Sequence, residues 1–226
     1  FEEAVALNIM PMVYTDVGSS VEKASRKHQK KVPVHICVDT GIGRVGVPVA
    51  KALPLIRQLA SLKSIEIAGI MMTFTEDPEF DKEQFTRFGN LCASLQQSGI
   101  TVGMRHAVSS YGLFQHPDMF LDMVRPGMVL YGIYPDKEFR GSPALNLRPA
   151  VSLKTRVIYT KQLKRGESAG YNRVFMAKED TWVATLPVGH ADGIPREVTK
   201  GGRIRISDVL YSAVAISASH CIVDLG

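Results

Sequence analysis

Residues 34–46 (VHICVDTGIGRVG) join an apolar run that ends at Asp39 to a glycine-rich loop that carries Arg44. The run is rich in β-branched residues and predicts a buried strand, and the apolar spacing of residues 49–62 predicts a helix after the loop. Strand, loop and helix in this order form the repeating unit of a parallel α/β sheet. In such a sheet Arg44 lies at the carboxyl end of a strand. It could offer its planar fork to a carboxylate or phosphate, or it could be a solvated residue of a plain turn.

The same alternation of apolar runs and helical patterns extends from residue 1 to about residue 135. Strand patterns occupy residues 9–14, 34–39, 65–74, 104–108 and 128–133, and helical patterns occupy residues 19–29, 49–62, 80–97 and 111–114. Strands that are apolar on both faces and separated by helices predict a parallel sheet. Their repeat matches a (β/α)8 TIM barrel, which needs about 250 residues, so we expect the C-terminal part of such a barrel; an open sheet is the alternative.

After a polar segment at residues 140–149 the helical patterns end. Strand patterns follow at residues 151–163, 181–187, 203–206, 209–216 and 221–225, with glycine-containing turns between them. The fold class is therefore α/β plus all-β, and we predict part of a barrel domain at 1–140 and part of a β domain at 141–226. Because the chain opens inside a helical pattern and stops as a strand pattern ends, we expect an internal fragment of a longer protein.

Composition excludes several classes of protein. The chain has 226 residues, 45% of them hydrophobic, a formal net charge of +5 and three widely spaced cysteines. So few cysteines argue against a disulfide framework and favour a reducing, cytoplasmic compartment. No metal-ligand spacing occurs, and no apolar run reaches membrane-spanning length. The densest basic cluster, at residues 26–31, suits a helix end; a nucleic-acid surface is the alternative, but no aromatic residues interleave with it, so we predict no nucleic-acid partner.

Two more polar motifs lie beside predicted strands of the first domain, one just after a strand and one at a strand entry. Ser109 and Ser110 open a short helix, where they could bind a phosphate or simply cap the helix. Arg125 precedes Pro126 and Gly127, a sequence that could expose the next amides to a phosphate or form only a tight turn.

The second domain carries two further motifs. Tyr171 lies beside Gly170 in a predicted hairpin, where its phenol could act as an acid or base or be an ordinary surface group. The loop at residues 186–196 (LPVGHADGIPR) combines His, Asp and Arg, which could line a cleft or be solvated one by one.

Taken in order, these five motifs resemble alanine racemase, and the likeness covers nearly the whole chain. The resemblance implies a barrel that binds pyridoxal 5'-phosphate (PLP), fused to a β domain, in a head-to-tail homodimer in which the β domain of one subunit closes the barrel mouth of the other. It implies interconversion of L-alanine and D-alanine, or of serine or another small amino acid, by two-base proton transfer at Cα. An unrelated α/β binding protein is the more distant alternative.

The resemblance also implies a role for each matching residue. Arg125 would face the pyridine nitrogen, and Arg44 would bind the substrate carboxylate. Tyr171 would be one catalytic base, acting in the site of the partner subunit. The remaining roles fall into two groups: Ser110 and the amides of Gly127 and Met128 would hold the phosphate, and His106, His190 and Arg196 would line the entrance corridor.

Several positions depart from the family pattern. The lysine that forms the Schiff base would precede this chain, so we expect the fragment alone to be inactive. Cys37 replaces a lysine that braces the substrate-binding Arg, Thr73 replaces a His and Ser109 replaces an Asn. His190 replaces a corridor Tyr, and the segment at residues 217–219, with Ala218 at its centre, replaces Cys-Met-Asp. These changes leave a non-catalytic homologue that binds PLP or a partner as the alternative function.

Overall fold

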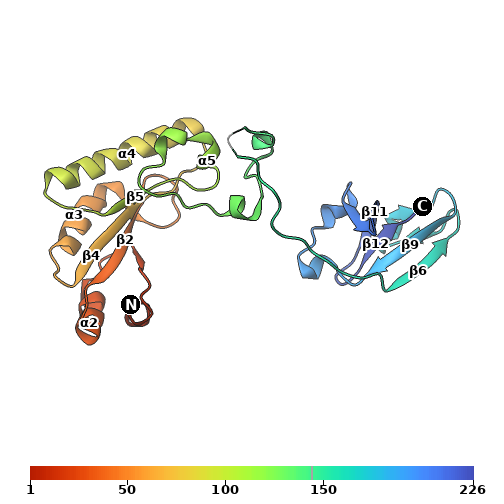
Figure 1. Ribbon diagram of the computed structural model, residues 1–226, viewed down its shortest axis with the longest axis horizontal. Coiled ribbons are helices and arrows are strands. Elements are labelled where there is room, and N and C mark those ends of the chain that lie inside the picture. Colours follow the sequence, from red (N-terminus) through yellow and green to blue (C-terminus); the bar gives the residue numbers. More distant parts are fainter. Residues whose placement is uncertain (144) are drawn as a thin grey trace. The chain divides into compact units, whose positions relative to one another are not determined.

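The computed structural model describes residues 1–143 and 145–226. Its internal contacts divide the chain into two units, Phe1–Val151 and Ser152–Gly226. The first unit contains a parallel sheet with helices packed on it, and the second contains an antiparallel sheet (Figure 1). The predicted fold class, the rear part of a barrel followed by a β domain, agrees with this order.

The first unit is built on a parallel sheet with the order β1-β2-β4-β5, to which the short strand β3 adds by pairing with β2. The strands are β1 (Met12–Val13), β2 (Val32–Asp39), β3 (Val47–Pro48), β4 (Ile65–Met71) and β5 (Met104–His106). The helices are α1 (Glu2–Ala6), α2 (Gly18–His28), α3 (Val49–Ala60), α4 (Pro78–Gln97) and α5 (Gly112–Gln115). Helices α3 and α4 lie next to each other along the sheet (Figure 1).

Burial explains why these segments form strands and helices. The apolar side chains of β2 and β4 pack against those of α3 and α4 in one hydrophobic core. Helix α4 begins sharply because the Asp77 carboxylate accepts hydrogen bonds from the amides of Glu79 and Phe80, and Pro78 occupies the first helical position. All the parallel strands therefore end at one edge of the sheet, and the loops that follow them carry the predicted site.

The second unit is an antiparallel sheet with the order β10-β11-β12-β9-β6, accompanied by the hairpin β7-β8. Its strands are β6 (Tyr159–Leu163), β7 (Ser168–Ala169), β8 (Phe175–Met176), β9 (Thr181–Leu186), β10 (Arg203–Ile206), β11 (Val209–Ile216) and β12 (Cys221–Asp224). Two small hydrophobic clusters hold it together, one of them around Leu186 and Val223 and the other around Leu163 and Val183.

Two sequence predictions of secondary structure are wrong. The strand predicted at 128–133 is a 3-10 helix, Met128–Tyr131, in which Leu130 and Tyr131 are exposed and the amide of Leu130 bonds back to the carbonyl of Gly127 (3.1 Å). The strand predicted at 151–163 begins only at Tyr159. In both segments the apolar residues lie on the surface, so their pattern did not indicate burial in a sheet.

The cysteines form no disulfide among the described residues. Cys37 is buried in the first unit and Cys221 in the second, and burial raises the pKa of both thiols. In the part of the chain that the structure describes, none of the helices is both long and apolar enough to cross a bilayer.

Candidate functional site

The loop after β2 is held by the carboxylate of Asp39. Its Oδ1 accepts hydrogen bonds from the amides of Gly41 (2.9 Å) and Gly43 (3.1 Å), which folds the loop back over the strand end. Arg44 follows on the same loop, and its exposed guanidinium makes no hydrogen bond or ion pair with any described residue. The arginine is therefore available to an anionic ligand.

Arg125 is held by the ends of two neighbouring strands. Its Nη2 donates to the carbonyls of Met72 (2.8 Å) and Ala107 (3.0 Å), and to Thr73 Oγ1 at 3.4 Å. Its Nη1 donates to His106 Nδ1 (2.8 Å). Burial, and after it the charge of Arg44, lowers the pKa of Arg125, although the guanidinium stays charged at neutral pH. The Nε–H has no partner among the described residues.

The contact with Arg125 fixes the proton positions on two histidines. Arginine can only donate, so His106 Nδ1 must accept and its proton must sit on Nε2. That Nε2 lies 2.8 Å from His35 Nδ1, which accepts in turn. Burial, then the charges of Arg125 and His35, lowers the pKa of His106 to about 4. The result is a chain of neutral imidazoles that starts at the Arg125 guanidinium.

Ser110 and the segment that follows Arg125, Gly127–Val129, form a small polar cradle. The Ser110 hydroxyl accepts a hydrogen bond from the amide of Gly127 (2.8 Å) and lies 3.5 Å from the amide of Val129. A side chain added at Gly127 would meet only Ser110 Oγ, at 3.8 Å, with no other atom within 4 Å. The amide of Met128 makes no hydrogen bond to any described residue. The Ser110 O–H and the Met128 amide therefore remain as donors, whereas the Gly127 amide already donates to Ser110.

Arg44 and Arg125 meet at one cavity of about 450 Å³. Its lining residues are Ile42, Arg44, Met71, Thr73, Phe74, Thr75, Glu76, Ser109 and Arg125, and they do not include Ser110, Gly127 or Met128. The cavity therefore brings together the predicted substrate-binding and cofactor-binding arginines. A larger cavity of about 570 Å³ lies beside α4 and contains none of the predicted site residues. Of these two cavities, the smaller one contains the arginines that the motifs predict.

Tyr171 lies in the second unit, on a 3-10 turn between β7 and β8. Its side chain is 78% exposed and lines a cavity of about 290 Å³ with Ser217 and His220. The turn depends on Gly170, because its φ is 80° and a Cβ there would lie 2.6 Å from the Cβ of Ala215. The fold thus presents the phenol of Tyr171 at the surface of its own unit.

The two other residues predicted for the corridor in this unit contact each other. Arg196 Nη2 donates to His190 Nε2 (3.2 Å), and the amide of His190 bonds to the carbonyl of Ser217 (2.9 Å). The loop that carries His190 therefore packs against the segment that contains Ala218.

His106 is not where the resemblance predicted it. It is only 2% exposed, with both ring nitrogens hydrogen-bonded within the first unit, so it cannot line an open corridor. The reason is that β5 ends at His106 and directs its ring between His35 and Arg125.

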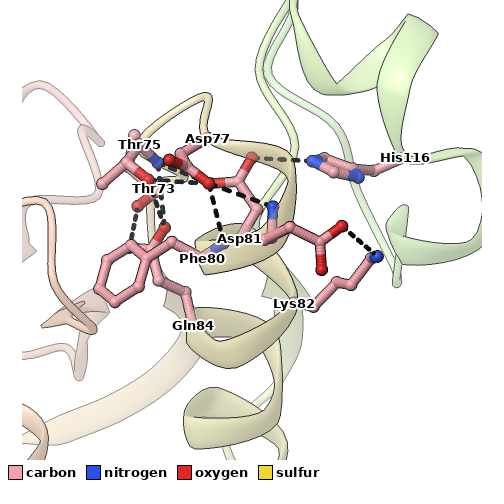
Figure 2. Close-up of polar contacts among 9 residues, drawn as sticks. Thr73, Thr75, Asp77, Phe80, Asp81, Lys82, Gln84 and His116 are labelled. Carbon is pink, nitrogen blue, oxygen red and sulfur yellow. Dashed lines mark hydrogen bonds and ion pairs between the residues drawn. The ribbon is translucent and has the colours of Figure 1, made fainter.

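Some residues around the cavity were not singled out from the sequence: His35, Glu76, Asp81, Gln84 and His116. Alternation along β2 places His35, Cys37 and Asp39 on one face, a signal that could have identified His35. Asp81 and His116 carry no such signal. They are 35 positions apart, and only tertiary packing brings Asp81 Oδ2 within 2.8 Å of His116 Nε2 (Figure 2).

Comparison with known proteins identifies the family. Two family models match the chain: the N-terminal domain of alanine racemase over residues 1–135 and the C-terminal domain over residues 150–226. The alanine racemase of Clostridium tetani is 34% identical over 232 residues, covering 99% of this chain and 60% of its own length. That of Desulforamulus reducens is 32% identical over 231 residues, covering 99% of this chain and 62% of its own.

Solved structures give the same result. The alanine racemase of a D-cycloserine-producing Streptomyces lavendulae matches all of this chain and 61% of its own, with a TM-score of 0.89 and 25% identity. That of Bartonella henselae, which contains covalently bound pyridoxal phosphate, matches 99% of this chain and 62% of its own, with a TM-score of 0.76 and 26% identity. The chain spans about 60% of the length of such relatives. It belongs to the alanine racemase family.

Proposed function

We propose that this chain forms part of a PLP-dependent racemase that interconverts L-alanine and D-alanine, with serine or another small amino acid as a further substrate. One observation carries the proposal: Arg125 shares a cavity with Arg44, and among the described residues neither the Nε–H of Arg125 nor the guanidinium of Arg44 has a partner. A cofactor ring nitrogen and a substrate carboxylate are acceptors that suit these two donors.

The residues present fit PLP. The Nε–H of Arg125 would donate to the pyridine nitrogen, while Ser110 and the amides of Gly127 and Met128 would hold the phosphate. The space beside Gly127, which a side chain would enter, suits a phosphate oxygen. An arginine in place of an acid leaves the ring nitrogen unprotonated, and the neutral His106 behind it cannot supply a proton.

The protein's own groups would then carry out the proton transfer. When bound, PLP would delocalise the negative charge that develops at the substrate Cα. Arg44 would bind and orient the carboxylate, so that the Cα–H bond points at a base. Starting from one enantiomer, Tyr171 would take the proton from one face of Cα. In the reverse direction its phenol would give a proton back to that face. The second base would be the lysine that the family places on the first barrel strand.

The exposure of Tyr171 supports a homodimer. A catalytic tyrosine needs a site closed against water, and 78% exposure within its own unit leaves that site to be completed by another surface. We infer a head-to-tail pair in which Tyr171 of one subunit serves the cavity of the other.

The test uses the protein at its full natural length, with PLP added. We expect it to produce D-alanine from L-alanine, measured by chiral chromatography, and to show a visible absorption band that borohydride abolishes. If the band forms but no D-alanine does, the protein is instead a PLP-binding homologue without racemase activity. If neither is seen, the cofactor assignment is refuted as well.

A further inference from the structure

The first turns of α4 bury a carboxylate that the proposed mechanism does not use. Asp81 is 0% exposed. Its Oδ1 accepts hydrogen bonds from both the amide and the hydroxyl of Thr75, each at 3.0 Å, and its Oδ2 lies 2.8 Å from His116 Nε2 (Figure 2). Every bond joins Asp81 to a residue outside its own helix. Such a buried, fully paired carboxylate fixes the segments that it bonds.

Gln84, one turn further along α4, extends the same network. Its Oε1 accepts a hydrogen bond from the amide of Thr75 (3.0 Å), while its Nε2 donates to the carbonyl of Thr73 (3.2 Å) and to Thr40 Oγ1 (3.1 Å). Gln84 is also 0% exposed. The face of α4 that carries Asp81 and Gln84 therefore bonds to the chain after β2, after β4 and after β5.

Two of those three strand ends also hold Arg125. The carbonyl of Met72 and the hydroxyl of Thr73 follow β4, and the carbonyl of Ala107 follows β5; all three accept from Arg125 Nη2. Asp81 bonds to the continuation of the same two segments: at Thr75, two residues after Thr73, and at His116, which lies nine residues after Ala107 at the end of α5. The spacing between the segments after β4 and after β5 thus affects both the hydrogen bonds of Asp81 and the orientation of the Arg125 guanidinium.

We propose that Asp81 is a positioning residue for Arg125: by joining Thr75 to His116 it fixes the two strand ends between which the guanidinium sits. This proposal rests on the proposed function, because Arg125 is taken to face a pyridine nitrogen. Asp81 itself touches no ligand. We expect a larger effect on ligands that need the Nε–H of Arg125 than on phosphate alone. Ser110 lies on the segment between Ala107 and His116, but neither Asp81 nor Gln84 makes a hydrogen bond to Ser110 or Gly127 among the described residues.

The test compares two ligands on the full-length protein. PLP carries a phosphate and a ring nitrogen, whereas phenyl phosphate carries a phosphate but no ring nitrogen. For Asp81→Ala we expect the dissociation constant of PLP, measured by calorimetry, to rise about tenfold and that of phenyl phosphate to change less than twofold. Asp81→Asn, which can still accept from Thr75 and donate to His116, should restore PLP binding to within about threefold.

Controls separate the possible failures. Asp118→Ala removes an exposed acid near His116 and should leave both dissociation constants unchanged. If Asp81→Ala does not fold, Thr75→Val removes one of the three bonds at nearly constant volume and should raise the PLP constant about threefold. Equal weakening of both ligands, or no weakening of PLP, would overturn the role of Asp81. A wild-type protein that binds no PLP would overturn the proposed function instead.

Discussion

Within the described residues, the parallel unit buries six polar or charged side chains (Thr40, Asp81, Gln84, His106, Ser110 and His116), whereas the antiparallel unit buries only Thr181. The six lie behind the strand ends rather than in the lining of the cavity that holds Arg44 and Arg125, and nearly all of them are hydrogen-bonded between segments that follow different strands. Tyr171, the functional candidate of the second unit, is instead exposed on a turn. In the proposed function Arg125 is therefore held in place by the protein itself, whereas Tyr171 needs a second surface to complete its site.

The largest effect that tests this contrast is expected for Tyr171→Phe. Loss of the phenol should slow racemisation from either alanine enantiomer by about 10² to 10⁴-fold, the usual contribution of a general acid or base, because Tyr171 is the base in one direction and the acid in the other. Because the side chain is exposed, the dissociation constant of PLP and the melting temperature should stay unchanged. Kinetics from each enantiomer, with calorimetry for PLP, would measure this, and equal activity of the two proteins would remove Tyr171 from the mechanism.

A pH dependence confined to the parallel unit would sharpen the comparison. The pKa of His106 falls from 6.5 to about 4 on folding. Between these values the unfolded chain binds the proton and the folded chain does not, so stability is complete above pH 6.5 and is lost as the pH falls towards 4. The loss is roughly 3 kcal/mol, and His35, whose pKa burial also lowers, adds to it.

Urea unfolding at a series of pH values, followed by helical circular dichroism, would measure this loss. The single tryptophan, Trp182, belongs to the antiparallel unit, so its fluorescence gives an internal control. A flat stability between pH 6.5 and 4 would show that burial and the charge of Arg125 do not hold His106 neutral.

The smallest effect is expected from a pair of glycine substitutions. At Gly69 an added Cβ would lie 2.5 Å from the ring of His35 and 2.8 Å from the carbonyl of Met104, so Gly69→Ala should cost about 1–3 kcal/mol of unfolding free energy. At Gly89, inside α4, nothing lies within 4 Å, and Gly89→Ala should stabilise by about 0.5–1 kcal/mol. Thermal unfolding of both variants checks the signs. If both variants were destabilised, the space beside Gly89 on α4 would be too small for an added methyl group.

The sequence predicted the fold class because burial leaves a regular pattern. The structure contains both the strand predicted at 34–39 and the helix predicted at 80–97. The helix begins slightly earlier, at Pro78, because Asp77 caps it. The prediction failed at residues 128–133, where an apolar alternation belongs to an exposed 3-10 turn. A local pattern shows which side chains are apolar. It does not show whether a neighbouring strand is present to pair with the segment, because that depends on the rest of the chain.

The candidate site divides in the same way. Arg44 and Ser110 could be found because each follows a predicted strand, and the carboxyl ends of parallel strands share one edge. Arg125 was found from the Pro-Gly sequence that follows it. The Asp81–His116 contact could not be found, because neither residue belongs to a motif and their distance depends on how α4 docks. His106 was recognised as important, but its place behind Arg125 depends on a side-chain direction that spacing does not encode.

The two buried thiols give each unit its own reporter. Cys37 lies in the parallel unit and Cys221 in the antiparallel one, and burial keeps both protonated and therefore slow to react with alkylating reagents. Each becomes reactive only when its surroundings open. Mass-spectrometric labelling rates at these two positions would thus report how often each half of the chain unfolds, in one sample and without any mutation.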